Sequence, residues 1–176
     1  IFPKQMSGEK VPQEIINKML ELANWAPTHR NTEPWRFKVY SGESMNRMLD
    51  FCKQCYVKDT PAEKYNSIKL EKIEQRKEQV SHIVAICMDR NEILPEFEEI
   101  AATAMAVQNM WLHLASTEKY GGYWSTPSYA LGEEFSAFLH LPKEERCLGL
   151  FYIGTIAEDA VRAEGKRGDW REKVKF

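Results

Sequence analysis

A loop bounded by two prolines, residues 26–35, carries the side chains that first suggest a binding site. It reads Ala-Pro-Thr-His-Arg-Asn-Thr-Glu-Pro-Trp, which places His29 and Arg30 between Pro27 and Pro34. Proline restricts the backbone, and a loop that is already ordered loses less entropy when it binds a ligand. The alternative is a stiff connection from a helix to a strand, with Trp35 in the core. The residues favour the two interpretations equally.

A second segment, residues 120–127, reads Tyr-Gly-Gly-Tyr-Trp-Ser-Thr-Pro. Two glycines allow a backbone to approach a flat ligand closely. Trp124, Ser125 and Thr126 then add an aromatic ring and two hydroxyl groups. The alternative is the end of a helix followed by a turn, and the local residues favour that alternative.

The cysteines do not form a complete redox or metal motif. Cys52 and Cys55 match C-x-x-C, but they fall late in a predicted helix, whereas a redox pair follows a strand and opens a helix. No second ligand pair has zinc spacing. We therefore interpret them as ordinary helix cysteines. The sequence also lacks the glycine-rich nucleotide motifs and the G-x-S-x-G motif of hydrolases.

Length and charge limit the class of protein. The 176 residues, 43% of them hydrophobic, predict one domain over residues 1–176 with a substantial core. The formal net charge of −2 gives no reason to expect nucleic acid or a membrane surface as partner. No apolar run approaches the roughly 20 residues of a membrane span, and no signal-peptide pattern is present. We expect a cytoplasmic protein.

The periodicity of apolar residues predicts an α+β fold. Helical spacing marks residues 12–25, 44–56, 65–79, 95–119 and 133–139, whereas strand patterns mark 35–40, 82–88 and 147–156. Strands and helices do not alternate regularly, which favours α+β over a doubly wound sheet. The charged helix at 65–79 is expected to be solvated, with a thin apolar stripe.

The helix at 95–119 is the longest predicted element. From Ile100 to Ala115 almost every residue is apolar or small, which predicts a helix buried nearly all round. Such a helix is either the centre of the core or the spine of a dimer. Gly121 and Gly122 are expected to end it, and His113 within it is interpreted as a core histidine.

Three motifs in order resemble the nitroreductase family of flavin enzymes. They are A-P-x-H-x-x-x-x-P-W at residues 26–35, G-G-x-W-[RS]-[ST] at 121–126, and G-x-x-Y-I-G-T at 149–155. The resemblance implies a nitroreductase-like fold with a central antiparallel or mixed sheet flanked by helices, a long central helix and a domain-swapped C-terminal arm. It also implies FMN and a homodimer with active sites at the interface.

The same resemblance suggests cofactor-binding positions. Trp25 and His29 fall where the proline-bounded loop meets the flavin, and Arg30 is a nearby donor. Trp124, Ser125 and Thr126 fall beside the ribityl chain and ring, and Arg167 is a second cation for the phosphate. The family's R-R-S phosphate motif would fall just before Ile1, at which this sequence begins.

The implied activity is hydride transfer from NAD(P)H through flavin N5 to a nitroaromatic, a quinone or a similar acceptor, by a ping-pong mechanism. No side chain is expected to be catalytic, because the flavin carries the chemistry, and no metal site is expected. A flavin-binding module without turnover remains the alternative.

Overall fold

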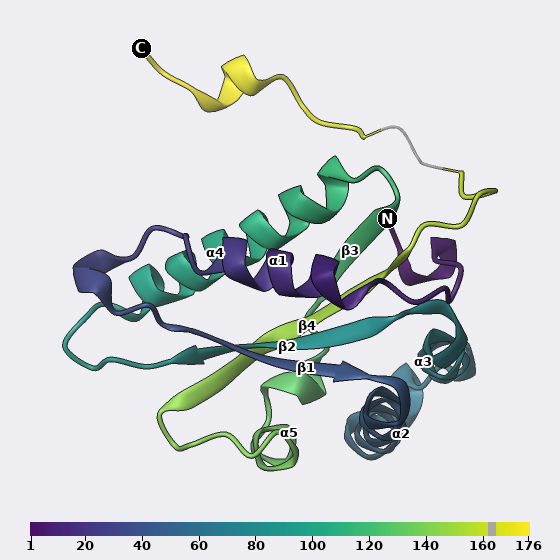
Figure 1. The fold of residues 1–176 in the computed structure, drawn as a ribbon. Helices are drawn as coiled ribbons and strands as arrows, with labels where there is room; N and C mark the ends of the chain where they lie inside the picture. The colour runs from purple at the N-terminus through teal and green to yellow at the C-terminus, as the bar shows by residue number, and fades with distance from the viewer. Residues whose placement is uncertain (162–164) are drawn as a thin grey trace.

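The structure is a computed structural model that describes residues 1–161 and 165–176. In the described residues, four strands form one antiparallel sheet in the order β1-β2-β4-β3 (Figure 1). The strands are β1 (Trp35–Ser41), β2 (His82–Asp89), β3 (Tyr120–Ser125) and β4 (Glu145–Thr155). β2 and β4 are therefore central, and β1 and β3 are the edges.

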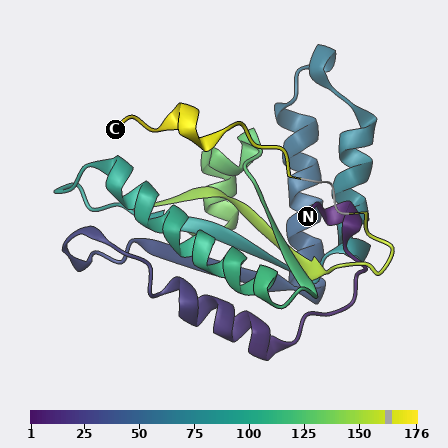
Figure 2. The ribbon, with the colours of Figure 1, turned by 90° about the horizontal axis from the view of Figure 1, so that it is seen from above.

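Helices cover both faces of the sheet and make a three-layer arrangement (Figures 1 and 2). One layer holds α1 (Gln13–Ala23) and α4 (Glu96–Ser116). The other holds α2 (Gly42–Asp59), α3 (Ser67–Gln79) and α5 (Glu133–Phe138). Short 3₁₀ turns join them, including η2 (His29–Asn31), η3 (Ala62–Lys64) and η4 (Ser128–Leu131). The predicted α+β class is confirmed, and all the strand pairings are antiparallel.

Alternating side chains of the central strands divide the core in two. On β2, Ile83 and Ala85 pack with α2, α3 and α5, whereas Val84 and Ile86 pack with α1 and α4. β4 repeats the pattern. Because successive side chains of a strand point to opposite faces, a strand buried on both faces is apolar at every position. This explains the unbroken apolar run that predicted β2.

The prediction that the long helix is buried nearly all round is wrong for a single chain. Its inner face is buried through Ala102, Ala106, Met110 and Leu114, at a spacing of four residues. Its outer side leaves large apolar side chains exposed: Phe97, Ile100, Met105, Trp111 and Leu112. A helix that lies on one sheet has only one face to bury against it.

The expected turn at Gly121 and Gly122 is also wrong. α4 already ends at Ser116, and the chain reverses at Glu118, whose φ is +57°. The two glycines then lie inside β3, where Gly122 pairs with Ile153. A Cβ atom at Gly122 would lie 2.2 Å from Cζ of Phe151. The glycine is needed there because this ring packs against the strand.

A buried ion pair fixes the connection between β2 and α4. Glu99 is 1% exposed, and Arg90 donates to its carboxylate over 2.6 Å. The same carboxylate accepts the backbone N–H of Asn91, and Arg90 also donates to the carbonyl of Leu94. These bonds hold the loop against the first turn of the helix and so set where α4 starts.

Replacing Glu99 is expected to destabilise the fold strongly. Glu99→Ala leaves the Arg90 guanidinium largely buried without its carboxylate, which costs about 3–5 kcal/mol of unfolding free energy. Urea denaturation measures the difference, with Glu92→Ala as control because Glu92 is exposed in the same loop. Equal stability of the two variants would show that the ion pair does not hold this connection.

Candidate functional site

A cavity of about 590 Å³ lies where β3 and α4 meet. Its walls are mostly aromatic and apolar, and they include Val107, Trp111, Tyr123, Trp124 and Phe151. Arg167 contributes a cation from the C-terminal segment, which runs outside the layered body of the fold after β4 (Figure 1). We call this space the aromatic cavity. A flat apolar ring that carries an anionic group matches its chemistry.

The end of β3 is held in place by hydrogen bonds to the neighbouring strand. Trp124 Nε1 and Thr126 Oγ1 both donate to the carbonyl of Leu148, over 3.4 and 3.2 Å. Gly149, at φ +139°, permits this contact, because a Cβ atom there would lie 2.5 Å from Trp124 Nε1. The indole is thus fixed along one wall of the aromatic cavity.

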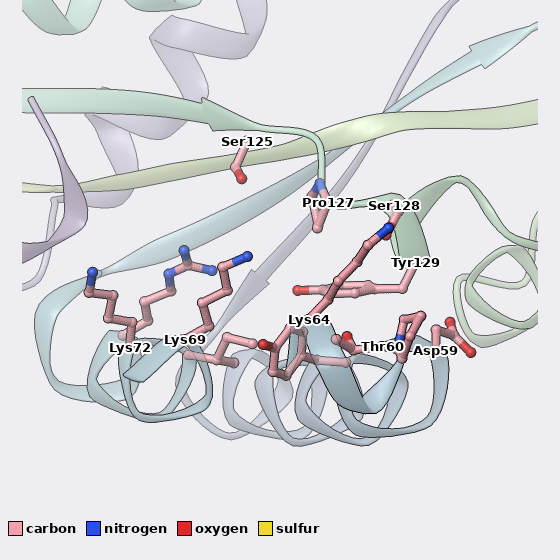
Figure 3. Close-up of a pocket in the computed structure, with 13 residues that line it drawn as sticks. Asp59, Thr60, Lys64, Lys69, Lys72, Ser125, Pro127, Ser128 and Tyr129 are labelled. Carbon is pink, nitrogen blue, oxygen red and sulfur yellow. The ribbon is translucent and has the colours of Figure 1, made fainter. Parts of the chain in front are cut away.

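A second cavity, of about 540 Å³, opens between α3 and the loop that follows β3 (Figure 3). Lys64, Lys69, Lys72 and Arg76 line one part of it, and Ser125, Ser128 and Tyr129 face it from the β3–η4 side. We call it the basic cavity. The sequence analysis does not predict it, because the charged helix at 65–79 is expected there only to be solvated. Cations at positions 69, 72 and 76 share one helix face, and this spacing was the available signal.

The structure does not bring the proline-bounded loop to either cavity within one chain. Trp25 is 78% exposed, and neither His29 nor Arg30 lines the aromatic or the basic cavity. His29 instead makes a short contact through Nδ1 to the carboxylate of Glu98 on α4. Arg30 adopts a φ of +52°, a conformation uncommon for residues other than glycine.

The sequence-predicted site residues therefore form two groups. Trp124 and Arg167 share the aromatic cavity, and Ser125 lines the basic cavity beside it. Thr126 is exposed and supports the strand end. Trp25, His29 and Arg30 line neither cavity, and His29 lies against Glu98 near the start of α4.

The interpretation of Cys52 and Cys55 as ordinary helix cysteines is confirmed. Both lie within α2 and are buried in the core. Burial raises the pKa of the Cys52 thiol to about 12, which keeps it protonated at neutral pH. A buried protonated thiol is a poor nucleophile and a poor metal ligand.

The sequence and the fold match a known class of protein. A family model described as the Nitroreductase family matches residues 4–155. The chain therefore belongs to the nitroreductase family, a class of oxidoreductases.

Individual relatives agree with that assignment. "Putative NAD(P)H nitroreductase YfhC" of Bacillus subtilis (strain 168) is 28% identical over 156 residues, which cover 86% of this chain and 77% of YfhC. A solved nitroreductase-like family protein from Bacillus cereus superposes with a TM-score of 0.79 at 22% identity, over 98% of this chain and 88% of the other.

The FMN-dependent nitroreductase NfnB from Mycobacterium smegmatis, solved in complex with NADPH, has the same fold. It superposes with a TM-score of 0.77 at 16% identity and covers 97% of this chain and 91% of its own. In this chain, no helix of the described residues is long and apolar enough to span a membrane.

We expect the native protein to resist thiol labelling. All four cysteines are buried, so a thiol reagent such as dithionitrobenzoate at pH 8 should react slowly before unfolding and with four thiols in guanidinium chloride. Absorbance of the released thiolate reports both the rate and the count. Rapid labelling of Cys52 or Cys55 in the native protein would revive the redox interpretation of C-x-x-C.

Proposed function

We propose that the protein is an FMN-dependent reductase that takes hydride from NAD(P)H and passes it to a nitroaromatic, a quinone or a similar acceptor. The observation that carries the proposal is the aromatic cavity, which joins Trp124 of the G-G-x-W segment to Arg167. FMN would supply a ring that accepts hydride at N5 and releases it to a second substrate in a ping-pong scheme.

The residues of the aromatic cavity fit FMN. Trp124, Tyr123 and Phe151 offer apolar surface for an isoalloxazine ring, and the volume lies within the range of cofactor sites, about 300–1,000 Å³. The Arg167 guanidinium can donate two parallel hydrogen bonds to phosphate oxygens. Ser125 and Thr126 follow Trp124 at the strand end, where Ser125 lines the basic cavity and Thr126 Oγ1 donates to the carbonyl of Leu148. In this proposal, the side chains of the aromatic cavity bind and orient the isoalloxazine ring and exclude water from one of its faces.

We propose further that the active site is completed by a second copy of the chain. The outer face of α4 leaves Trp111, Leu112 and Ile100 exposed, and a large exposed apolar patch is typical of an interaction surface. A partner packed on this face would cover one side of the aromatic cavity, which Trp111 also lines. The proline-bounded loop, with Trp25, His29 and Arg30, would then contribute across the interface, and the C-terminal arm would exchange between chains.

The visible spectrum and anaerobic reduction test this function. The purified protein, incubated with FMN and freed of excess by gel filtration, is expected to show flavin absorbance bands. Mixing with NADPH in a stopped-flow instrument without oxygen should bleach them, and a quinone should restore them. A bound flavin that stays oxidised would favour a binding module without turnover, and a protein that retains no FMN would overturn the proposal altogether.

The His29→Ala variant extends the same test to the loop. Loss of one polar contact is expected to raise the dissociation constant of FMN by roughly three- to tenfold. His140→Ala is the control, because His140 is exposed in another loop. Equal FMN affinity of the two variants would show that His29 does not bind FMN and serves only in its contact with Glu98.

Trp111→Ala tests the dimer. Removal of a central aromatic contact commonly costs an interface about 2 kcal/mol or more, so the dimer should dissociate at least roughly 30-fold more readily. Sedimentation velocity over a range of concentrations measures this. Val57→Ala is the control, since Val57 is similarly exposed on α2, on the other side of the sheet. A wild-type protein that sediments as a monomer at all concentrations would contradict the proposed assembly.

A further inference from the structure

We propose that Cys87 and Cys147 form a redox-sensitive pair of thiols, which a peroxide converts to a disulfide between β2 and β4. This pair is separate from Cys52 and Cys55 of the C-x-x-C segment, which lie within α2. The inference is independent of the proposed function, because it rests on how two central strands of the sheet pair in the core.

The register of the sheet brings the two cysteines together. Cys87 of β2 pairs directly with Cys147 of β4 in an antiparallel ladder. Directly opposite residues of such a ladder have Cα atoms about 4.5–5.5 Å apart, and disulfides span Cα separations of about 4.4–6.8 Å. The backbone therefore holds the pair at a distance that a disulfide can bridge without moving either strand.

A β-bulge places both cysteine side chains on the same face of the sheet. Ile86 of β2 pairs with Gly149 of β4. The next residue of β2, Cys87, pairs with Cys147, so Leu148 is an extra residue on β4. Side chains of a regular strand alternate between faces, and an extra residue moves those before it to the opposite face. Cys147 thus joins Cys87 in the core beside α2, α3 and α5, whereas Leu148 packs on the other face.

The two thiols interact and differ in acidity. The Cys87 thiol donates a hydrogen bond to Cys147, which lowers the pKa of Cys147 and raises the pKa of Cys87. The other acceptor near the Cys87 thiol, the carbonyl of Ala85, lies 3.9 Å away and is a weaker partner. Cys87 is completely buried, whereas Cys147 is 5% exposed. Cys147 is therefore the sulfur that reacts first, because the thiolate is the nucleophile.

Oxidation of the pair by hydrogen peroxide takes two steps. The Cys147 thiolate attacks one peroxide oxygen, so that an S–O bond forms, the O–O bond breaks and the leaving hydroxide takes up the thiol proton as water. The Cys87 sulfur then attacks the sulfur of this sulfenic acid. The S–S bond forms, the S–O bond breaks, and the departing hydroxide leaves with the Cys87 proton as a second water. Two thiols thus give two electrons and two protons to one peroxide molecule.

The disulfide would stiffen the strand end that holds Trp124. Leu148 directly follows Cys147, and its carbonyl accepts the hydrogen bonds of Trp124 Nε1 and Thr126 Oγ1. A covalent bond beside the bulge restricts the residue that anchors one wall of the aromatic cavity. The link also closes a long loop, from residue 87 to residue 147, which stabilises the fold by restricting the unfolded chain.

The test treats the fully reduced, native protein with hydrogen peroxide, which catalase then removes. The count of free thiols in guanidinium chloride is expected to fall from four to two, and dithiothreitol should restore it. Peptide mass spectrometry without reductant should show one link, between residues 87 and 147. The melting temperature of the oxidised protein should rise by about 5 °C or more.

Cys87→Ala and Cys52→Ala form a matched pair of variants, because both residues are completely buried in the same core cluster. Cys87→Ala should form no disulfide and should leave Cys147 as a sulfenic acid that dimedone traps. Cys52→Ala should still lose two thiols and form the same link as the wild type. The peptide link in the wild type decides the inference even where a variant folds poorly.

Three results would overturn the inference. The first is a native protein that keeps all four thiols at a peroxide dose that fully oxidises free cysteine. The second is a disulfide that includes Cys52 or Cys55 in place of the proposed pair. The third is a link between residues 87 and 147 that forms no faster in the native protein than in guanidinium chloride, where the sheet no longer holds the cysteines together.

Discussion

Burial of the two central strands on both faces is the constraint on which this structure depends. Residues Ile83–Met88 of β2 are completely buried, and β4 is buried from Gly149 to Thr155. Such strands require a helical layer on each side, because each face removes apolar area from water at roughly 25 cal/mol per Å². The helices flank the sheet accordingly, and both candidate cavities lie at the edge strand β3. Trp124 faces the α4 layer and Ser125 faces the α3 layer, so one strand end supplies both cavities.

Local sequence patterns predicted most of the helices and strands. Long-range packing decided two features that these patterns predicted wrongly, namely the burial of α4 and the conformation of Gly121 and Gly122. The apolar run of β2 and the helical spacing of apolar residues in α1 are local patterns that identify a buried strand and a helix directly. Gly121 and Gly122 give no local signal for a strand, because a glycine has no side chain that could show the alternation of a strand. Their strand conformation follows from Phe151 on β4, some thirty residues later, whose ring fills the space above Gly122. No local pattern contains that contact.

The candidate site was predictable as a set of motifs and not as an arrangement in space. The resemblance selected Trp124 and Arg167, and the structure places both at the aromatic cavity. It also selected His29, which lies against Glu98 near the start of α4. The basic cavity had a weak signal in the spacing of Lys69, Lys72 and Arg76. Solvated helices have similar spacings, and only the packing of η4 opposite α3 distinguishes a cavity from an open surface.

The composition of α4 connects assembly to the chemistry of the site. Small residues such as Ala102 and Ala106 on its inner face allow the helix to lie close to the sheet, whereas Trp111 and Leu112 face outward. Large apolar side chains on an exposed face are costly in water unless another surface covers them. Because Trp111 and Val107 also line the aromatic cavity, a partner that covers this face would remove water from the cavity as well. In the proposed dimer, the apolar area that would stabilise the assembly is the same area that would enclose the aromatic cavity, and this would account for a helix of 21 residues that is apolar on two sides although one chain buries only one.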